Sequence, residues 1–175
     1  MYQYCLDELN KILASIQQGS NSNIKDEYHI TDVMILKKEL EHLKIKIINI
    51  SLELYVLELG TSTYIQENDT LHTTIENTFK DTIESAYQIG YDTGIAISEN
   101  IFSHFYFYQN EFEKALLHID KSIQVNEETY DSLGYKITLE VKENILTEFL
   151  KFKDESTIRK NLETVRKELD GLKNE

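Results

Sequence analysis

Three acid–histidine pairs have the residue types and spacing that a metal site could use. A carboxylate precedes an imidazole by three residues in Asp26/His29, Glu39/His42 and Asp69/His72. On a helix, positions i and i+3 share a face, and two Glu-x-x-His helices with two further carboxylates build a di-iron site. Only Glu39/His42 falls well inside an expected helix, and it lies outside the apolar stripe of that helix. Surface charge pairing accounts for such pairs in an acidic chain, so we predict no metal and no cofactor.

Other catalytic groups form no recognisable arrangement. The sequence has neither a Gly-x-Gly-x-x-Gly phosphate loop nor a His-Glu-x-x-His zinc motif. Cys5, the single cysteine, is expected in a first short helix as a small core residue. His104 and His118 have no obvious carboxylate that would orient them for acid–base work. We therefore predict that the protein is not an enzyme.

Composition favours an all-α protein of one domain. The 175 residues include no proline and only six glycines, and they are rich in Glu, Lys, Leu and Ile. The start, MYQYCLDELN, lacks the layout of a signal peptide, and no run of about 18 apolar residues could span a membrane. A lone cysteine rules out an intramolecular disulfide and suits a reducing compartment. These features predict a cytoplasmic protein.

The acidic charge is concentrated in the middle of the chain. Residues 53–150 hold 18 acids and 5 bases, which equals the whole net charge of −13. One interpretation is a solvated surface that maintains solubility. The other is a surface that attracts a basic partner or the free amino group of a peptide. Both interpretations argue against direct nucleic-acid binding through this region.

Residues 96–127 have the pattern of two short helices joined by a tight link. One apolar stripe consists of Ile97, Ile101, Phe105 and Tyr108. Gln109-Asn110 interrupts it, and Asn suits a helix end. The second stripe consists of Phe112, Leu116, Ile119 and Ile123, with the small Ala115 beside it. Such a hairpin leaves apolar faces uncovered, so we expect neighbouring helices to stack on it.

The same segment resembles one tetratricopeptide repeat, a helix pair of about 34 residues. The positions that the repeat mask selects are Glu99, Phe102, Ser103, Tyr106, Ala115, Ile119 and Glu127. Glu99 replaces the Trp of the mask and Glu127 replaces its Pro. The resemblance implies a right-handed array of stacked antiparallel hairpins with about seven helices, whose first helices line a concave surface for extended peptides.

In this register the resemblance gives a candidate peptide-binding surface. Its residues are Ile97, Asn100, His104, Phe107 and Tyr108, with Asn144 and also Asn77, Gln88, Thr138 and Lys142 expected from neighbouring helices. An Asn amide both donates to and accepts from a peptide backbone, and aromatic rings offer apolar contact. The alternative is that Phe107 and Tyr108 belong to the core and that Asn100 caps a helix or faces water.

Asn100, Tyr106 and the run Phe112-Glu113-Lys114-Ala115-Leu116 also look similar to the repeat domains of peptide-pheromone-sensing regulators of Gram-positive bacteria. Members of that family bind short secreted peptides, often dimerise, and usually carry an N-terminal helix-turn-helix. Residues 1–30 show no helix-turn-helix. The resemblance implies a peptide-reading domain without a DNA-binding head, or a truncated relative, with a role in peptide signalling or transcription control.

A long helix near the start carries the most regular periodicity. Spacings of three and four alternate through Val33, Leu36, Leu40, Leu43, Ile47, Ile50, Leu54 and Leu57, with Gly60 as the expected stop and Thr31-Asp32 as the expected cap. Further apolar residues in its second half favour a central core helix. The alternative is a homodimer seam through Val33, Leu36, Leu40 and Leu43.

We expect one helical domain over residues 1–175. It would comprise N-terminal helices in 1–60, repeat-like helices in 70–152 and a capping helix in 153–175. Two functions remain open. The first is a helical repeat module that binds a short peptide or protein segment. The second is an acidic immunity or antirepressor type of protein that inhibits one basic partner.

Overall fold

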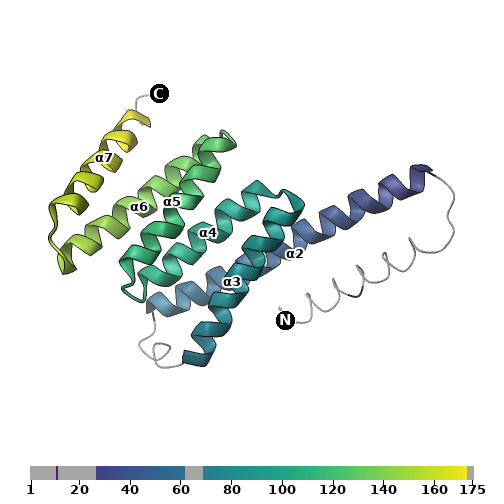
Figure 1. Ribbon diagram of the computed structural model, residues 1–175, viewed down its shortest axis with the longest axis horizontal. Coiled ribbons are helices and arrows are strands. Elements are labelled where there is room, and N and C mark those ends of the chain that lie inside the picture. The colour runs from purple at the N-terminus through teal and green to yellow at the C-terminus, as the bar shows by residue number, and fades with distance from the viewer. Residues whose placement is uncertain (1–10, 12–26, 62–68, 173–175) are drawn as a thin grey trace.

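Every element of secondary structure in the described part of the chain is a helix (Figure 1). The computed structural model describes Lys11, residues 27–61 and residues 69–172. Its helices are α2 (Glu27–Thr61), α3 (Asp69–Ile89), α4 (Asp92–Phe107), α5 (Phe112–Glu128), α6 (Ser132–Phe152) and α7 (Ser156–Leu172). The predicted all-α class is confirmed. The expected first helix lies outside the described residues, apart from Lys11.

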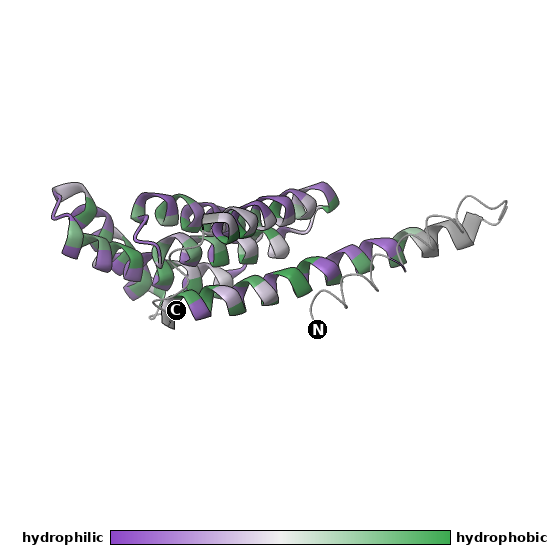
Figure 2. Ribbon diagram, turned by 90° about the horizontal axis from the view of Figure 1, so that it is seen from below, coloured by the Kyte–Doolittle hydropathy of each residue, from purple (hydrophilic) through white to green (hydrophobic). Residues whose placement is uncertain are grey.

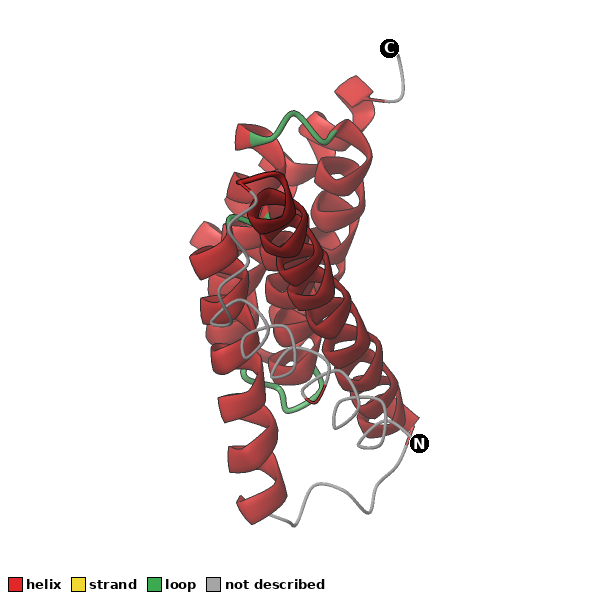
Figure 3. Cartoon of the chain, turned by 90° about the vertical axis from the view of Figure 1, so that its right-hand side faces the viewer, coloured by secondary structure: helices red, strands yellow, loops and turns green. Residues whose placement is uncertain are grey.

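Consecutive helices pack against each other from α2 to α7, and α2 also packs against α4. Links of two to four residues join α3 through α7, so sequence neighbours run antiparallel (Figure 1). The long α2 extends past the row of shorter helices at one end. Figure 3, which shows all described helices and the loops between them, contains no strand among them.

Local chemistry sets the ends of α3 to α6. Gly90 and Asn110 adopt positive φ angles of 65° and 61°, which Gly and Asn tolerate better than most residues. The predicted interruption at Gln109-Asn110 is therefore confirmed. Asp131 caps α6 by accepting a hydrogen bond from the Gly134 amide at 2.9 Å. The link between α5 and α6 consists of residues 129–131, because α5 continues to Glu128.

Helix α4 forms the centre of the core. Phe102 and Phe105 are almost fully buried, and Phe102 stacks on Phe79 of α3 with 4.5 Å between ring centroids. On the other side, Ala115 and Ile119 of α5 are completely buried. A small side chain at Ala115 lets the two helix axes approach closely, as the sequence pattern predicted.

The long helix differs from its prediction in two respects. It begins at Glu27, so Thr31 and Asp32 lie inside the helix and do not cap it. Its core-facing residues are Ile45, Asn49, Leu52, Val56 and Leu59. The regular a/d seam lies largely on the opposite, open face, because α3 and α4 pack on one side of α2 only. The further apolar residues of its second half, and not the seam, contribute to the core, so α2 is buried on one side only. Figure 2 shows α2 along one edge of the molecule with apolar segments on its ribbon.

Candidate binding site

A hollow of about 320 Å³ lies where α4, α5 and the start of α6 meet beside α2. We call it the α4–α6 hollow. Its lining residues are Glu53, Thr93, Ala96, Ile97, Asn100, Ile101, Ser122, Asn126, Asp131, Leu133, Gly134, Ile137 and Thr138. Each helix contributes residues four apart, such as Ile97/Ile101, Ser122/Asn126 and Leu133/Ile137. Residues at that spacing lie on one face of a helix, so the periodicity of three helices converges on one place.

The rim of the hollow is aliphatic and exposed. Ile97, Leu133 and Ile137 keep 44%, 67% and 46% of their surface in solvent. An exposed aliphatic cluster around a depression is typical of a surface that another molecule covers.

Beneath the rim, the floor is small and its hydroxyls are satisfied. Ser122 donates to the carbonyl of Ala96 at 2.8 Å, and Thr138 donates to the carbonyl of Gly134 at 2.9 Å. Both hydroxyls already donate to carbonyls, so a ligand does not need to supply a hydrogen-bond acceptor for either one. The floor can therefore accept apolar groups at little desolvation cost.

Polar groups at the edges give the hollow a negative character. Glu53 and Asp131 contribute carboxylates, whereas no Lys or Arg is present among the described residues that line it. Asn100 and Asn126 add amides that can both donate and accept. Two carboxylates in a lining without a Lys or Arg attract a positively charged group. The arrangement therefore suits an aliphatic segment that carries a cation.

Gly134 permits the close approach of α5 and α6 at this point. A Cβ atom there would lie 2.7 Å from both Asn126 Oδ1 and Asp131 Oδ2. Any larger residue would push these two polar side chains away from their present positions. The shape of the hollow thus depends on the absence of a side chain at Gly134.

The structure places three of the residues expected at the surface in the hollow, namely Ile97, Asn100 and Thr138. His104 and Phe107 lie further along α4 and Tyr108 directly follows the helix, all three outside the lining. All three are half-buried. The Tyr108 ring lies against Gly60 of α2, and a Cβ atom on Gly60 would be only 2.7 Å from the ring.

The remaining expected residues lie elsewhere on the surface. Asn144 is exposed on α6, outside the lining, as are Asn77 and Gln88 on α3. Lys142 forms an ion pair with Asp120 of α5 at 2.7 Å. The structure therefore does not bring these side chains together with Ile97 and Asn100.

Several lining residues were missed because the sequence assigns them another role. Leu133 and Ile137 belong to an apolar stripe that predicts buried positions, yet both are exposed. Phe152, at the end of the same stripe, is exposed as well. Glu53 comes from α2, which is more than 40 residues away in the chain, and no local pattern connects it to α4. Only the concentration of acids in residues 53–150 pointed toward an acidic site.

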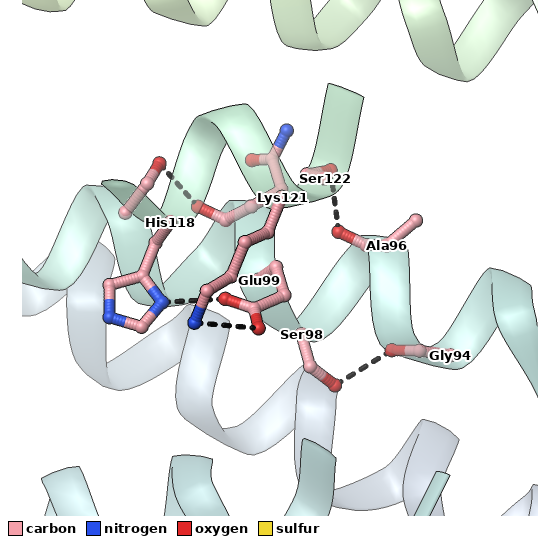
Figure 4. A network of polar contacts seen from close by, with 9 residues as sticks. Gly94, Ala96, Ser98, Glu99, His118, Lys121 and Ser122 are labelled. Carbon is pink, nitrogen blue, oxygen red and sulfur yellow. Dashed lines mark hydrogen bonds and ion pairs between the residues drawn. The ribbon is translucent and has the colours of Figure 1, made fainter. Parts of the chain in front are cut away.

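A buried polar network lies next to the hollow (Figure 4). Glu99 is 2% exposed, and its carboxylate accepts from His118 Nδ1 at 2.5 Å and lies 3.7 Å from Lys121 Nζ. His118 therefore does have a carboxylate partner, contrary to the prediction. The two residues are 19 positions apart, and only the pairing of α4 with α5 brings them together.

The network connects α4 to the neighbouring helices α5 and α2. The Ser98 hydroxyl lies 2.9 Å from Asn49 Oδ1, which connects α4 to α2. The His118 ring packs against Phe102 and Tyr106, with centroid separations of 4.1 and 5.3 Å. Neither Glu99 nor His118 lines the α4–α6 hollow. A buried carboxylate needs such partners, because an unpaired charge in the core is costly.

His104 has no such partner among the described residues. Its Nε2 atom is buried without a hydrogen bond, and its ring lies edge-on to Tyr108 with centroids 6.4 Å apart. Burial lowers the pKa of the imidazole, since the charged form would lose its hydration. His104 is thus a half-buried side chain whose uncharged form is favoured by its surroundings.

A second, larger hollow of about 560 Å³ separates α2 from α3. Its walls carry hydroxyls that bond within their own helices, such as Thr82 to the carbonyl of Thr78 at 2.6 Å and Ser51 to that of Ile47 at 3.0 Å. Its lining also includes a cation, Lys44, which pairs with Glu41 at 4.0 Å. We favour the α4–α6 hollow as the candidate site, because its two carboxylates have no Lys or Arg beside them among the described lining residues.

The described residues contain no group of three or more His, Cys, Asp or Glu side chains that could hold a metal ion. Of the three acid–histidine pairs in the sequence, Glu39/His42 is the one in which both side chains are described. Its carboxylate and imidazole lie 3.8 Å apart on α2. In the part of the chain that the structure describes, no helix combines the length and apolarity needed to cross a membrane.

Comparison with known proteins gives no relative. The chain matches no protein-family model, and neither a curated protein nor a solved structure matches it significantly.

Proposed function

We propose that this protein is a non-catalytic helical module that binds a short peptide or protein segment in the α4–α6 hollow. The observation that supports this most strongly is the pairing of an exposed aliphatic rim with two carboxylates that have no cation in the lining. Aliphatic side chains of a segment would cover Ile97, Leu133 and Ile137. A Lys, an Arg or a free amino terminus would lie toward Glu53 and Asp131.

The tetratricopeptide resemblance is part of this proposal. It places Ile97 and Asn100 on the ligand-binding side of the first helix of a pair, and both line the hollow. Asn100 would hold the backbone of the segment, since an amide can donate and accept at once. The similarity to pheromone-sensing regulators suggests that the segment is a regulatory peptide and that the protein acts in signalling or transcription control in the cytoplasm.

Two matched substitutions test the site. Asn100→Ala removes an amide inside the hollow, whereas Asn144→Ala removes one from the exposed face of α6. With a peptide selected from a display library, we expect Asn100→Ala to weaken binding about tenfold and Asn144→Ala to leave it unchanged, as measured by calorimetry. Equal affinities for the two variants would eliminate the hollow as the site.

The second candidate function is an acidic immunity or antirepressor type of protein. The concentration of acids in residues 53–150 favours it, because a large negative surface accelerates encounter with a basic protein. This function predicts tight binding to one folded basic protein that weakens steeply with salt. It also predicts no response to short peptides, so capture from host lysate at two salt concentrations would distinguish the two candidates.

A further inference from the structure

The open face of α2 carries an apolar strip that no described helix covers. We call it the outer seam, and it consists of Leu40, Leu43, Ile47, Ile50, Leu54 and Leu57. Leu43, Ile50 and Leu54 are 46%, 58% and 60% exposed. Over these residues the helix rises about 26 Å, and the spacing of three and four never breaks. So large and regular an apolar strip is unusual on a surface that faces only water.

The regularity of the outer seam indicates the shape of its partner. The a/d spacing repeats every 3.5 residues on average, which matches a second helix that lies along it in knobs-into-holes packing. The core of this chain already uses the other side of α2, through Ile45, Leu52 and Val56. A partner helix can therefore lie on the outer seam without disturbing the fold.

We propose that the partner is the outer seam of a second copy of this chain, arranged antiparallel about a two-fold axis between Ile47 and Ile50. In this register Leu40 packs in a layer with Leu57 of the second copy, Leu43 with Leu54, and Ile47 with Ile50. The same three layers repeat on the other side of the axis. All six seam residues of both copies are then covered.

Charges beside the seam select this orientation. Lys46 and Glu53 flank it on the side of α4, and Lys37 and Glu58 flank it on the side of α3. In the antiparallel register, Lys46 lies opposite Glu53 of the second copy, and Lys37 lies opposite Glu58. Glu53 also lines the α4–α6 hollow, so in the dimer Asp131 is the carboxylate that remains there for the cation of a ligand. In its own chain, Lys46 Nζ lies 5.9 Å from the centroid of the Tyr91 ring, and no ion pair of Lys46 or Glu53 is found within the described residues. A parallel pair in register would set Glu39 opposite Lys44 of the second copy but also Glu53 against Glu58, so that attraction and repulsion offset each other, whereas both antiparallel contacts are attractive.

Charge reversal in the full-length chain tests both the dimer and its direction. Sedimentation equilibrium at low salt would measure the dimer dissociation constant of the native chain, Lys46→Glu, Glu53→Lys and the double variant. Each single reversal creates two like-charge pairs, so we expect a dissociation constant about tenfold higher or more. The double variant exchanges the two charges and should return close to the native value. Lys160→Glu and Glu163→Lys, on exposed positions of α7, control for the change in net charge.

The outcomes separate the alternatives. Weakening by both single reversals with recovery in the double variant supports the proposal. A dimer that Glu53→Lys strengthens is parallel and overturns it. A chain that remains monomeric with a mass near 20.5 kDa also overturns it, and it would direct attention to the chain's own residues 1–26 as the cover of the seam. Circular dichroism on every variant checks that the helices are retained.

Discussion

Helices α2 and α4 show how differently an apolar stripe can be used. Both have regular apolar spacing, but α4 has helices on both sides and buries Phe102 and Phe105 completely between them. On α2, the most regular stripe faces outward, and the less regular residues Ile45 and Leu52 enter the core. The period of the apolar residues therefore indicates which face of a helix packs against another element. It does not show whether that element belongs to the same chain.

The largest expected effect contrasts the two stripes directly. Phe102→Ala should lower the free energy of unfolding by about 3–5 kcal/mol, because it opens a cavity among packed rings. Ile50→Ala on the outer seam should cost less than about 1 kcal/mol in dilute protein, since the side chain is exposed in the single chain. Urea unfolding at low concentration measures both. Similar losses would show that the seam is covered within the monomer.

The second contrast compares two acid–histidine pairs. Glu99→Gln should destabilise the protein by about 2 kcal/mol, because the buried His118 and nearby Lys121 lose the carboxylate that balances them. Glu39→Gln removes an exposed carboxylate that lies 3.8 Å from the largely buried His42, and it should change stability by less than about 0.5 kcal/mol. Thermal unfolding of the two variants checks this. A larger loss for Glu39→Gln would contradict the structural role of the Glu99 network.

A third contrast concerns exposed aliphatic residues inside and outside the hollow. Ile137→Ala should weaken binding of a selected peptide about tenfold, because roughly one apolar side chain loses its contact. Leu117→Ala alters an exposed residue of α5 outside the lining and should leave affinity unchanged. Calorimetric titration measures both variants. If only Leu117→Ala weakened peptide binding, the binding site would lie on the exposed face of α5 and not in the hollow.

The smallest effect is a pH dependence of stability near the α2–α4 contact. Burial lowers the pKa of His104 in the folded state, so the unfolded state binds its proton first as pH falls. Stability should therefore decline as pH drops below about 6.5, the ordinary histidine value, and the decline should end at the lowered pKa. The substitution His104→Phe should remove this decline from the plot of unfolding free energy against pH. Identical pH profiles for the two proteins would contradict the assignment of a neutral, buried imidazole.

The hairpin of α4 and α5 could be predicted because its signals are local. Stripes of apolar residues, the small Ala115 and the Gln109-Asn110 break all act within one or two helical turns. The Glu99–His118 pair and the contribution of Glu53 to the hollow could not be predicted, since both depend on which helices become neighbours. Ile97 and Asn100 were expected at a binding surface from the register that the tetratricopeptide resemblance implies, and both line the hollow. Their companions on α6 were hidden in a stripe that indicates burial.

The most direct test is an NMR titration with matched peptide pools that differ only in acetylation of the amino terminus. Short aliphatic peptides with a free amino group should shift the amide signals of Ile97, Asn100, Asn126 and Ile137 and leave the exposed face of α7 unchanged. The acetylated peptides should shift these amide signals less, because they offer no amino-terminal cation to Glu53 and Asp131. Absence of shifts at the hollow with both pools, or shifts confined to other acidic surfaces, would contradict binding in the α4–α6 hollow.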